Sequence, residues 1–100
     1  MLKHIVMWKL KDVAEGRSGQ ENADLMKEML GSLKGMIPEI GKIEVGININ
    51  SSDAAFDVVL YSEFRDEEAL LSYQKHPEHV KVADYVGKIN EKRVVVDYLV

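Results

Sequence analysis

The sequence predicts an α+β domain whose elements follow the order β-α-β-β-α-β, with four strands in one antiparallel sheet and the helices on one of its faces. Two observations predict this fold class. Apolar residues recur at every second position in four separate segments, which is typical of half-buried strands. Before the second and before the fourth of these segments the apolar spacing changes to three and four residues, which is typical of amphipathic helices. This order is the split βαβ arrangement.

The first strand is predicted over residues 2–10, and a helix follows it. One face of this strand carries Leu2, His4, Val6, Trp8 and Leu10. Residues 11–19 are expected to form a loop, at whose end Ser18 and Glu21 have the spacing of a capping box. The helix that starts there has one buried stripe, made of Met26, Met29, Leu30 and Leu33, and Gly35 with Pro38 ends it.

Two more strands are predicted over residues 42–50 and 56–64, joined by the turn-forming cluster Asn50–Asp53. Because this connection is short, the two strands are expected to pair antiparallel. Their apolar faces carry Ile43, Val45, Ile47 and Ile49 on the first and Phe56, Val58, Leu60 and Phe64 on the second.

The second half of the chain predicts a short helix, a longer helix and a last strand. Acidic residues Asp66–Glu68 suit the first turn of the short helix, which carries Ala69, Leu70 and Tyr73 inward. Pro77 suits the first position of the longer helix, whose stripe is Val82, Ala83, Val86 and Ile89. The last strand is expected over residues 93–100, with Val94, Val96, Tyr98 and Val100 facing the helices.

The other face of the predicted sheet mixes apolar and charged residues, which suits a partly polar interface with a second copy of the chain. We therefore expect a homodimer that closes sheet against sheet, and a monomer with a mixed outer face is the alternative. The residues expected on this face are Lys3, Ile5, Met7, Lys9, Glu44, Val59, Tyr61, Glu63, Arg93, Val95, Asp97 and Leu99.

Composition excludes several classes of function. The formal net charge is -4 and no basic cluster occurs, so we expect no nucleic-acid partner. The chain has no cysteine, which excludes disulfides and thiolate chemistry. No segment has the length of a membrane span or the pattern of a signal peptide, so we expect no membrane partner and a cytoplasmic location. No glycine-rich phosphate loop or dinucleotide fingerprint occurs, so we expect no cofactor, and residues 1–100 are expected to form one domain.

Three polar side chains fall on predicted inward faces, and they are the candidate catalytic residues. His4 shares its strand face with Val6 and Trp8, Tyr73 follows Leu70 on the short helix, and His79 precedes the stripe of the longer helix. A phenol and two imidazoles can exchange protons near neutral pH and can donate to a developing oxyanion. The positive end of the helix dipole favours a neutral ring at His79, which can then act as a base.

Two other interpretations of these residues stay open. An inward histidine or tyrosine often satisfies a buried backbone group and has no chemical role. His4, His76 and His79 could form a divalent-metal site, but the spacing His-x-x-His is a weak signal and Pro77 places His76 at a helix boundary, so we expect no metal.

The opening residues 1–12, with the pair Lys3 and His4, and the segment Tyr73-Gln-Lys-His-Pro-Glu-His79-Val resemble the stress-responsive A/B barrel domain (Dabb) family. The resemblance covers nearly the whole chain and implies a ferredoxin-like fold that dimerises as an α/β barrel. In a plant polyketide cyclase of this family, a tyrosine and a histidine match Tyr73 and His79, and a further pocket histidine matches His4. Where that cyclase has another histidine on the third strand, this chain has Val58.

The resemblance implies a small, largely apolar organic ligand, held between helices and sheet, with cyclase-like or lyase-like acid/base chemistry. His79 is the expected base, Tyr73 the oxyanion donor and His4 an orienting group. The expected substrate-binding residues are Val6, Trp8, Val58, Leu70 and Val82. Two alternatives stay open, a non-catalytic stress-related dimer that acts by interaction or stabilisation and a cofactor-free monooxygenase.

Overall fold

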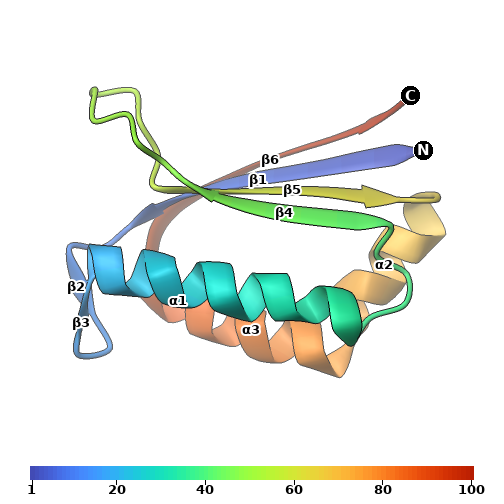
Figure 1. Cartoon of the computed structure of the whole chain (residues 1–100), viewed down its shortest axis with the longest axis horizontal. Coiled ribbons are helices and arrows are strands. Elements are labelled where there is room, and N and C mark those ends of the chain that lie inside the picture. The colour runs from blue at the N-terminus through green and yellow to red at the C-terminus, as the bar shows by residue number, and fades with distance from the viewer.

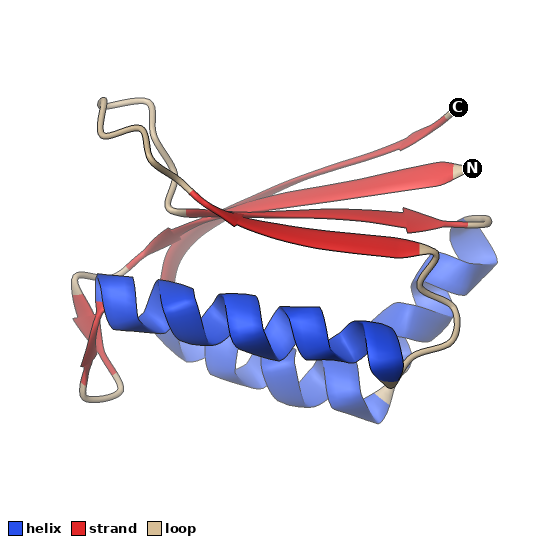
Figure 2. Cartoon of the chain, viewed as in Figure 1, coloured by secondary structure: helices blue, strands red, loops and turns tan.

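A four-stranded antiparallel sheet forms one layer of the protein and the helices form a second layer on one of its faces (Figures 1 and 2). The computed structural model describes all residues, 1–100. The strands are β1 (Leu2–Leu10), β4 (Lys42–Ile47), β5 (Val58–Phe64) and β6 (Asn90–Leu99), and they lie in the order β4-β5-β1-β6. The first and last strands of the chain are therefore neighbours, which confirms the predicted arrangement.

The helical layer consists of α1 (Gly19–Ser32), the short 3₁₀ helix η1 (Leu33–Gly35), α2 (Glu67–Lys75) and α3 (Pro77–Ile89). In Figure 1, α1 and α3 run side by side below the sheet, and α2 lies at the end where β5 finishes. None of these helices combines the length and the apolar character that crossing a membrane requires.

Each α-helix begins at a residue whose side chain accepts a backbone hydrogen bond. The Ser18 hydroxyl accepts from the Glu21 amide at 3.1 Å, and the Glu21 carboxylate accepts from the Ser18 amide at 2.9 Å, which is the capping box that the sequence predicts. Asp66 accepts from the Ala69 amide before α2. These contacts satisfy amide groups that have no partner within the first turn of a helix.

The loop predicted over residues 11–19 contains a small hairpin that periodicity does not reveal. Its strands are β2 (Val13–Ala14) and β3 (Arg17–Ser18), and its two turn residues have positive φ, 52° at Glu15 and 73° at Gly16. A two-residue turn of this kind matches the twist of a hairpin. Strands of two residues are too short for an alternating pattern, and Glu-Gly is a weaker turn signal than Asn-Gly.

The middle strands are shorter than predicted. β4 ends at Ile47 where the sequence predicts Asn50, and β5 begins at Val58 where it predicts Phe56. The Asn48 side-chain amide donates to the Phe56 carbonyl at 2.6 Å, and the Asn48 backbone amide donates to the Asp57 carbonyl. The connection between β4 and β5 therefore leaves the sheet at Asn48. In Figure 1 it rises away from the face that the helices cover.

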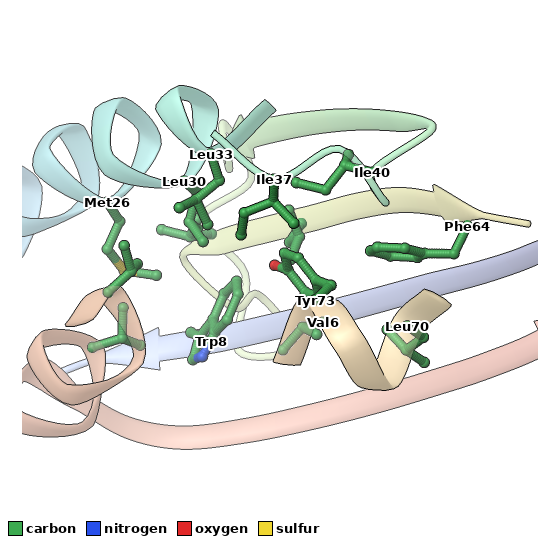
Figure 3. Close-up of a cluster of buried hydrophobic side chains, with 14 of the residues drawn as sticks. Val6, Trp8, Met26, Leu30, Leu33, Ile37, Ile40, Phe64, Leu70 and Tyr73 are labelled. Carbon is green, nitrogen blue, oxygen red and sulfur yellow. The ribbon is translucent and has the colours of Figure 1, made fainter. Parts of the chain in front are cut away.

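The core lies between the sheet and the helices, and Figure 3 shows part of it. Alternate residues of β1 and β5 point into it, because side chains along a strand alternate between the two faces of a sheet. Every residue of β5 at an even position is buried, and so is every such residue of β1. The helices contribute buried side chains that include Met26, Leu30, Tyr73, Val82, Val86 and Ile89.

The sequence assigns the residues of the last strand to the wrong faces of the sheet. In the β1–β6 pairing His4 lies opposite Asp97, Val6 opposite Val95 and Trp8 opposite Arg93. Directly opposed residues share a face, so the helix-facing residues of β6 are Arg93, Val95, Asp97 and Leu99. The sequence placed these on the outer face.

The cause is that β6 is an edge strand that the helices leave uncovered. Nine of its 10 residues are exposed, and apolar residues occur on both of its faces, so hydrophobicity does not distinguish them. The pairing with β1 also shifts by one residue between Lys9 and Leu10. This irregularity cannot be read from spacing alone.

The corrected outer face is more apolar along β6 than predicted. The exposed fraction is 42% for Met7, 41% for Val94 and 60% for Val96. Beside this apolar strip, the Lys3 ammonium donates to the Tyr61 hydroxyl at 2.8 Å and to the Glu63 carboxylate at 2.9 Å. The glutamate and the phenol both raise the pKa of Lys3, so its charge persists over the physiological pH range.

We expect Ser18→Ala to destabilise the protein by about 1 kcal/mol, because the Glu21 amide loses its partner in the capping box. Urea unfolding at one fixed protein concentration measures the change. Ser52→Ala is the control, because the Ser52 hydroxyl makes no hydrogen bond, and we expect it to stay within about 0.5 kcal/mol of wild type. Equal effects of the two substitutions would contradict the capping role.

Candidate functional site

A cavity of about 280 Å³ lies between the helices and the central strands. β1, β5 and β6 form its sheet side, and α1, α2 and α3 form its helical side. Most of its wall is apolar, and its few polar groups are two imidazoles, one phenol, one indole N–H, one amide and one guanidinium. The lining residues are His4, Val6, Trp8, Leu30, Leu60, Tyr73, His79, Val82, Ala83, Val86, Gly87, Asn90 and Arg93.

The three candidate catalytic rings lie together at one part of this cavity. The centroid of the Tyr73 ring is 4.5 Å from that of His79 and 6.4 Å from that of His4. Each ring comes from a different element, His4 from β1, Tyr73 from α2 and His79 from α3. The strand and helix periods therefore place these residues in one cavity.

His4 is held by the carboxylate of Asp97, a residue that the sequence predicts on the opposite face of the sheet. His4 is buried, and its Nδ1 forms a hydrogen bond with Oδ1 of Asp97, the residue directly opposite on β6. The carboxylate accepts, so Nδ1 carries the proton and the ring orientation is set. Asp97 was missed because the predicted facing of β6 pointed it away from the cavity.

The imidazole ring of His79 is neutral at neutral pH. Its Nδ1 lies 3.1 Å from the carbonyl oxygen of Gln74, which can only accept, so Nδ1 donates and the unprotonated nitrogen is Nε2. Burial lowers the pKa of His79 below 6.5, and the nearby charges of His4 and Arg93 lower it further, while the Gln74 carbonyl partly opposes the shift. At neutral pH, Nε2 therefore has a free lone pair.

Two buried donors of the protein have no hydrogen-bond partner within it, the Tyr73 hydroxyl and the indole N–H of Trp8. Both residues line the cavity, and Figure 3 shows both between the sheet and the helices. Burial raises the pKa of Tyr73 from 10.0 to about 12, so the phenol stays protonated and can donate. A buried donor without a partner costs about 1–3 kcal/mol, which an acceptor on a ligand would offset.

The predicted substrate-binding residues divide into two groups. Val6, Trp8 and Val82 line this cavity, whereas Val58 and Leu70 do not. Leu70 is buried in the core on α2, and Val58 lines a different hollow. Sequence reasoning missed the polar lining residues Asn90 and Arg93, and the correct facing of β6 is the signal that would have found Arg93.

That second hollow, of about 360 Å³, lies beneath the connection between β4 and β5. Met7 and Val59 of the sheet and residues such as Asn50 and Phe56 of the connection line it, and none of its lining residues titrates near neutral pH. It offers no acid or base, so the cavity between sheet and helices is the candidate site.

No three histidine, cysteine, aspartate or glutamate side chains lie close enough to hold a metal ion. The three histidines that spacing allowed as ligands have other arrangements. His76 caps α3, with its Nδ1 accepting from the Glu78 amide at 3.1 Å, while His4 bonds to Asp97 and His79 bonds to Gln74.

Comparison with known proteins gives relatives in sequence and in fold. The model of the family named Stress responsive A/B Barrel Domain matches residues 2–100. The Stress-response A/B barrel domain-containing protein DABB1 of Arabidopsis thaliana is 31% identical over 101 residues, which cover 99% of this chain and 47% of that protein. This chain thus spans about half the length of that curated relative.

Solved structures share the ferredoxin-like fold. A dimeric protein of unknown function from Bacteroides fragilis is 34% identical, with a TM-score of 0.84 over 99% of this chain and 95% of that one. The hydroxynitrile lyase of Passiflora edulis is 21% identical, with a TM-score of 0.81 over 99% and 92% of the two chains, and this likeness concerns the fold alone. Because the family model matches residues 2–100, the chain belongs to the stress-responsive A/B barrel domain family.

Proposed function

We propose that the cavity binds a small, largely apolar carbonyl compound and moves a proton on it. The observation that carries the proposal is the pairing of a neutral imidazole with an unpartnered phenol in one apolar cavity, with ring centroids 4.5 Å apart. The cavity, at about 280 Å³, is near the lower end of the range of about 300–1,000 Å³ that is usual for small-molecule sites.

In this mechanism His79 is the base and Tyr73 the oxyanion donor. Nε2 of His79 takes a proton from the carbon next to the carbonyl, and the electron pair of that C–H bond moves to form an enolate. The Tyr73 hydroxyl donates to the enolate oxygen, where charge develops. The imidazolium then returns the proton to carbon or to a leaving group, as a cyclase or lyase requires.

The positions of His4 and Asp97 support this assignment of roles. The carboxylate of Asp97 fixes the His4 ring beside Tyr73, at 6.4 Å between centroids, so His4 can orient the phenol or the ligand without being the base. The apolar wall, with Val6, Trp8 and Val82, suits the hydrocarbon part of the ligand and excludes water from the reacting atoms.

Exchange of ligand protons with solvent tests the proposed chemistry without a known substrate. With 1-phenyl-2-propanone in D₂O at pH 7.5, we expect the protein to accelerate loss of the α-proton signals in NMR spectra. His79→Gln and Tyr73→Phe should each lower the rate by about 10²-fold or more, because each removes a group that acts in the transition state.

His76→Asn is the control for this experiment. It removes a histidine that does not line the cavity and keeps a residue that can cap α3, so the exchange rate should stay close to wild type. A wild-type rate in His79→Gln, with only a lower melting temperature, would contradict catalysis and would favour the non-catalytic, stabilising role of the same rings.

The raised pKa of Tyr73 predicts a specific loss of stability at high pH. The unfolded chain releases the phenol proton near pH 10, whereas the folded protein retains it to about 12. The stability that this shift contributes is present below pH 10 and is lost as the pH rises through this window. Melting temperatures between pH 9 and 12 should fall less steeply for Tyr73→Phe than for wild type.

Tyr85→Phe is the matched control, because Tyr85 lies on α3, does not line the cavity, and its hydroxyl already has partners in the protein, accepting from Arg17 and donating to Asn22. We expect it to keep the wild-type slope. If both substitutions gave the same slope, burial of the Tyr73 hydroxyl would not be the cause of the alkaline transition.

We further propose that the chain forms a homodimer through the outer face of its sheet. The Bacteroides fragilis relative is dimeric. In this chain the outer face has an apolar strip along β1 and β6, with Met7, Val94 and Val96 all more than 40% exposed, next to the polar group of Lys3 and Glu63. Exposed apolar strips flanked by polar residues are typical of interfaces between subunits.

Val96→Lys should shift the protein from dimer to monomer, because it places a charge in the middle of the apolar strip. Sedimentation velocity at micromolar concentration measures the mass. Val13→Lys is the control, since Val13 is 72% exposed on the small hairpin, and it should leave the mass of a dimer unchanged. A wild-type mass near 11.3 kDa would rule out the proposed dimer.

A further inference from the structure

Arg93 is the one formally charged side chain among the residues that line the cavity when its histidines are neutral. It lies on the helix-facing side of β6, directly opposite Trp8 of β1. Arg93 is exposed whereas Trp8 and Tyr73 are buried, so the guanidinium stands at the solvent side of the cavity. It lies on the face opposite to the proposed dimer interface and therefore stays available in a dimer.

The guanidinium of Arg93 has no partner within the protein. None of the four ion pairs and none of the side-chain hydrogen bonds involves it. Two carboxylates of β6 flank Arg93 in sequence, Glu91 and Asp97; neither forms an ion pair with it, and Asp97, roughly 13 Å away along the strand, is bonded to His4. An arginine has five N–H donors in a planar fork, and here all of them are free for a ligand.

The charge of Arg93 acts on the reacting groups of the cavity. It lowers the pKa of Tyr73 against the larger effect of burial, and it adds to the effects of burial and of His4 that lower the pKa of His79. No acidic side chain lines the cavity, although the chain as a whole has a net charge of -4. Arg93 therefore puts a positive charge at the solvent side of the cavity, which favours anionic ligands there.

The indole of Trp8 lies between Arg93 at the solvent side of the cavity and the apolar residues of its wall. Directly opposed residues of antiparallel strands have Cβ atoms about 4.5–5.5 Å apart, so the Arg93 and Trp8 side chains start from neighbouring positions, and both line the cavity. Trp8 offers an aromatic surface together with an N–H that has no partner in the protein. This pairing suits a planar anion attached to a hydrocarbon or aryl group.

We propose that the ligand of this cavity is an organic carboxylate, held at its acid group by Arg93, with its apolar part against Trp8, Val82 and Val86. The carboxylate accepts two N–H bonds from the guanidinium, the arrangement that its planar fork favours. The carbonyl at which proton transfer takes place lies deeper, at Tyr73 and His79. This inference rests on the proposed function, because it assigns a substrate class to the same cavity.

Isothermal titration calorimetry at pH 7.5 with two probes of the same shape tests the proposal. The probes are 4-butylbenzoate and its uncharged amide, 4-butylbenzamide. We expect wild type to bind the acid about tenfold more tightly than the amide, since a hydrogen bond to a charged group contributes more than a neutral one. This preference should decrease as salt is added, because Arg93 is exposed.

Arg93→Gln should remove the preference and leave the affinity for the amide within about twofold of wild type. Lys92→Gln is the matched control, because it removes the same charge from the neighbouring position, whose side chain lies on the outer face next to Phe56. It should keep the preference. Because Arg93 and Lys92 are both exposed, both variants should fold, and their melting temperatures check this.

The outcomes separate this inference from the proposed function. If wild type binds both probes equally, or if Arg93→Gln keeps the preference, the assignment of a carboxylate to Arg93 is wrong and binding of apolar molecules in the cavity stands. If wild type binds neither probe, both the substrate class and the proposed ligand binding are wrong.

Discussion

The antiparallel pairing of β1 with its two neighbours is the constraint on which the rest of the structure depends. β1 is a central strand, so its alternate residues His4, Val6 and Trp8 lie under the helices and have no access to the outer face. Its register with β6 sets Asp97 against His4 and Arg93 against Trp8. The pairing of β1 thus positions the His4 ring, sets the Asp97 carboxylate against it and places the Arg93 charge at the edge of the cavity.

Burial lowers the pKa of His79 and raises the pKa of Tyr73, and both shifts suit the roles proposed for these groups. A histidine loses its charge more readily in an apolar cavity, and a tyrosine holds its proton more firmly. The same surroundings therefore keep His79 as a base and Tyr73 as a donor at neutral pH. In a shallow, solvent-exposed site the same two residues would keep pKa values close to their ordinary ones.

Much of this arrangement could be predicted from the sequence, because buried elements carry strong periodic patterns. His4, Tyr73 and His79 each share a face with apolar residues of the same strand or helix, and those apolar residues determine which way the side chains point. Asp97 and Arg93 could not be placed in this way. They belong to an edge strand with apolar residues on both faces, whose facing is set by hydrogen bonds to β1 and by a local irregularity.

The two ends of the chain lie beside each other on adjacent strands, joined by the Val100 amide to the Met1 carbonyl at 3.0 Å (Figure 1). A short peptide could therefore link them while the strand order stays the same. New ends could then be opened in the exposed connection between β4 and β5, which would give a circularly permuted protein with the same sheet. Such a rearrangement would keep all four strands paired as they are now.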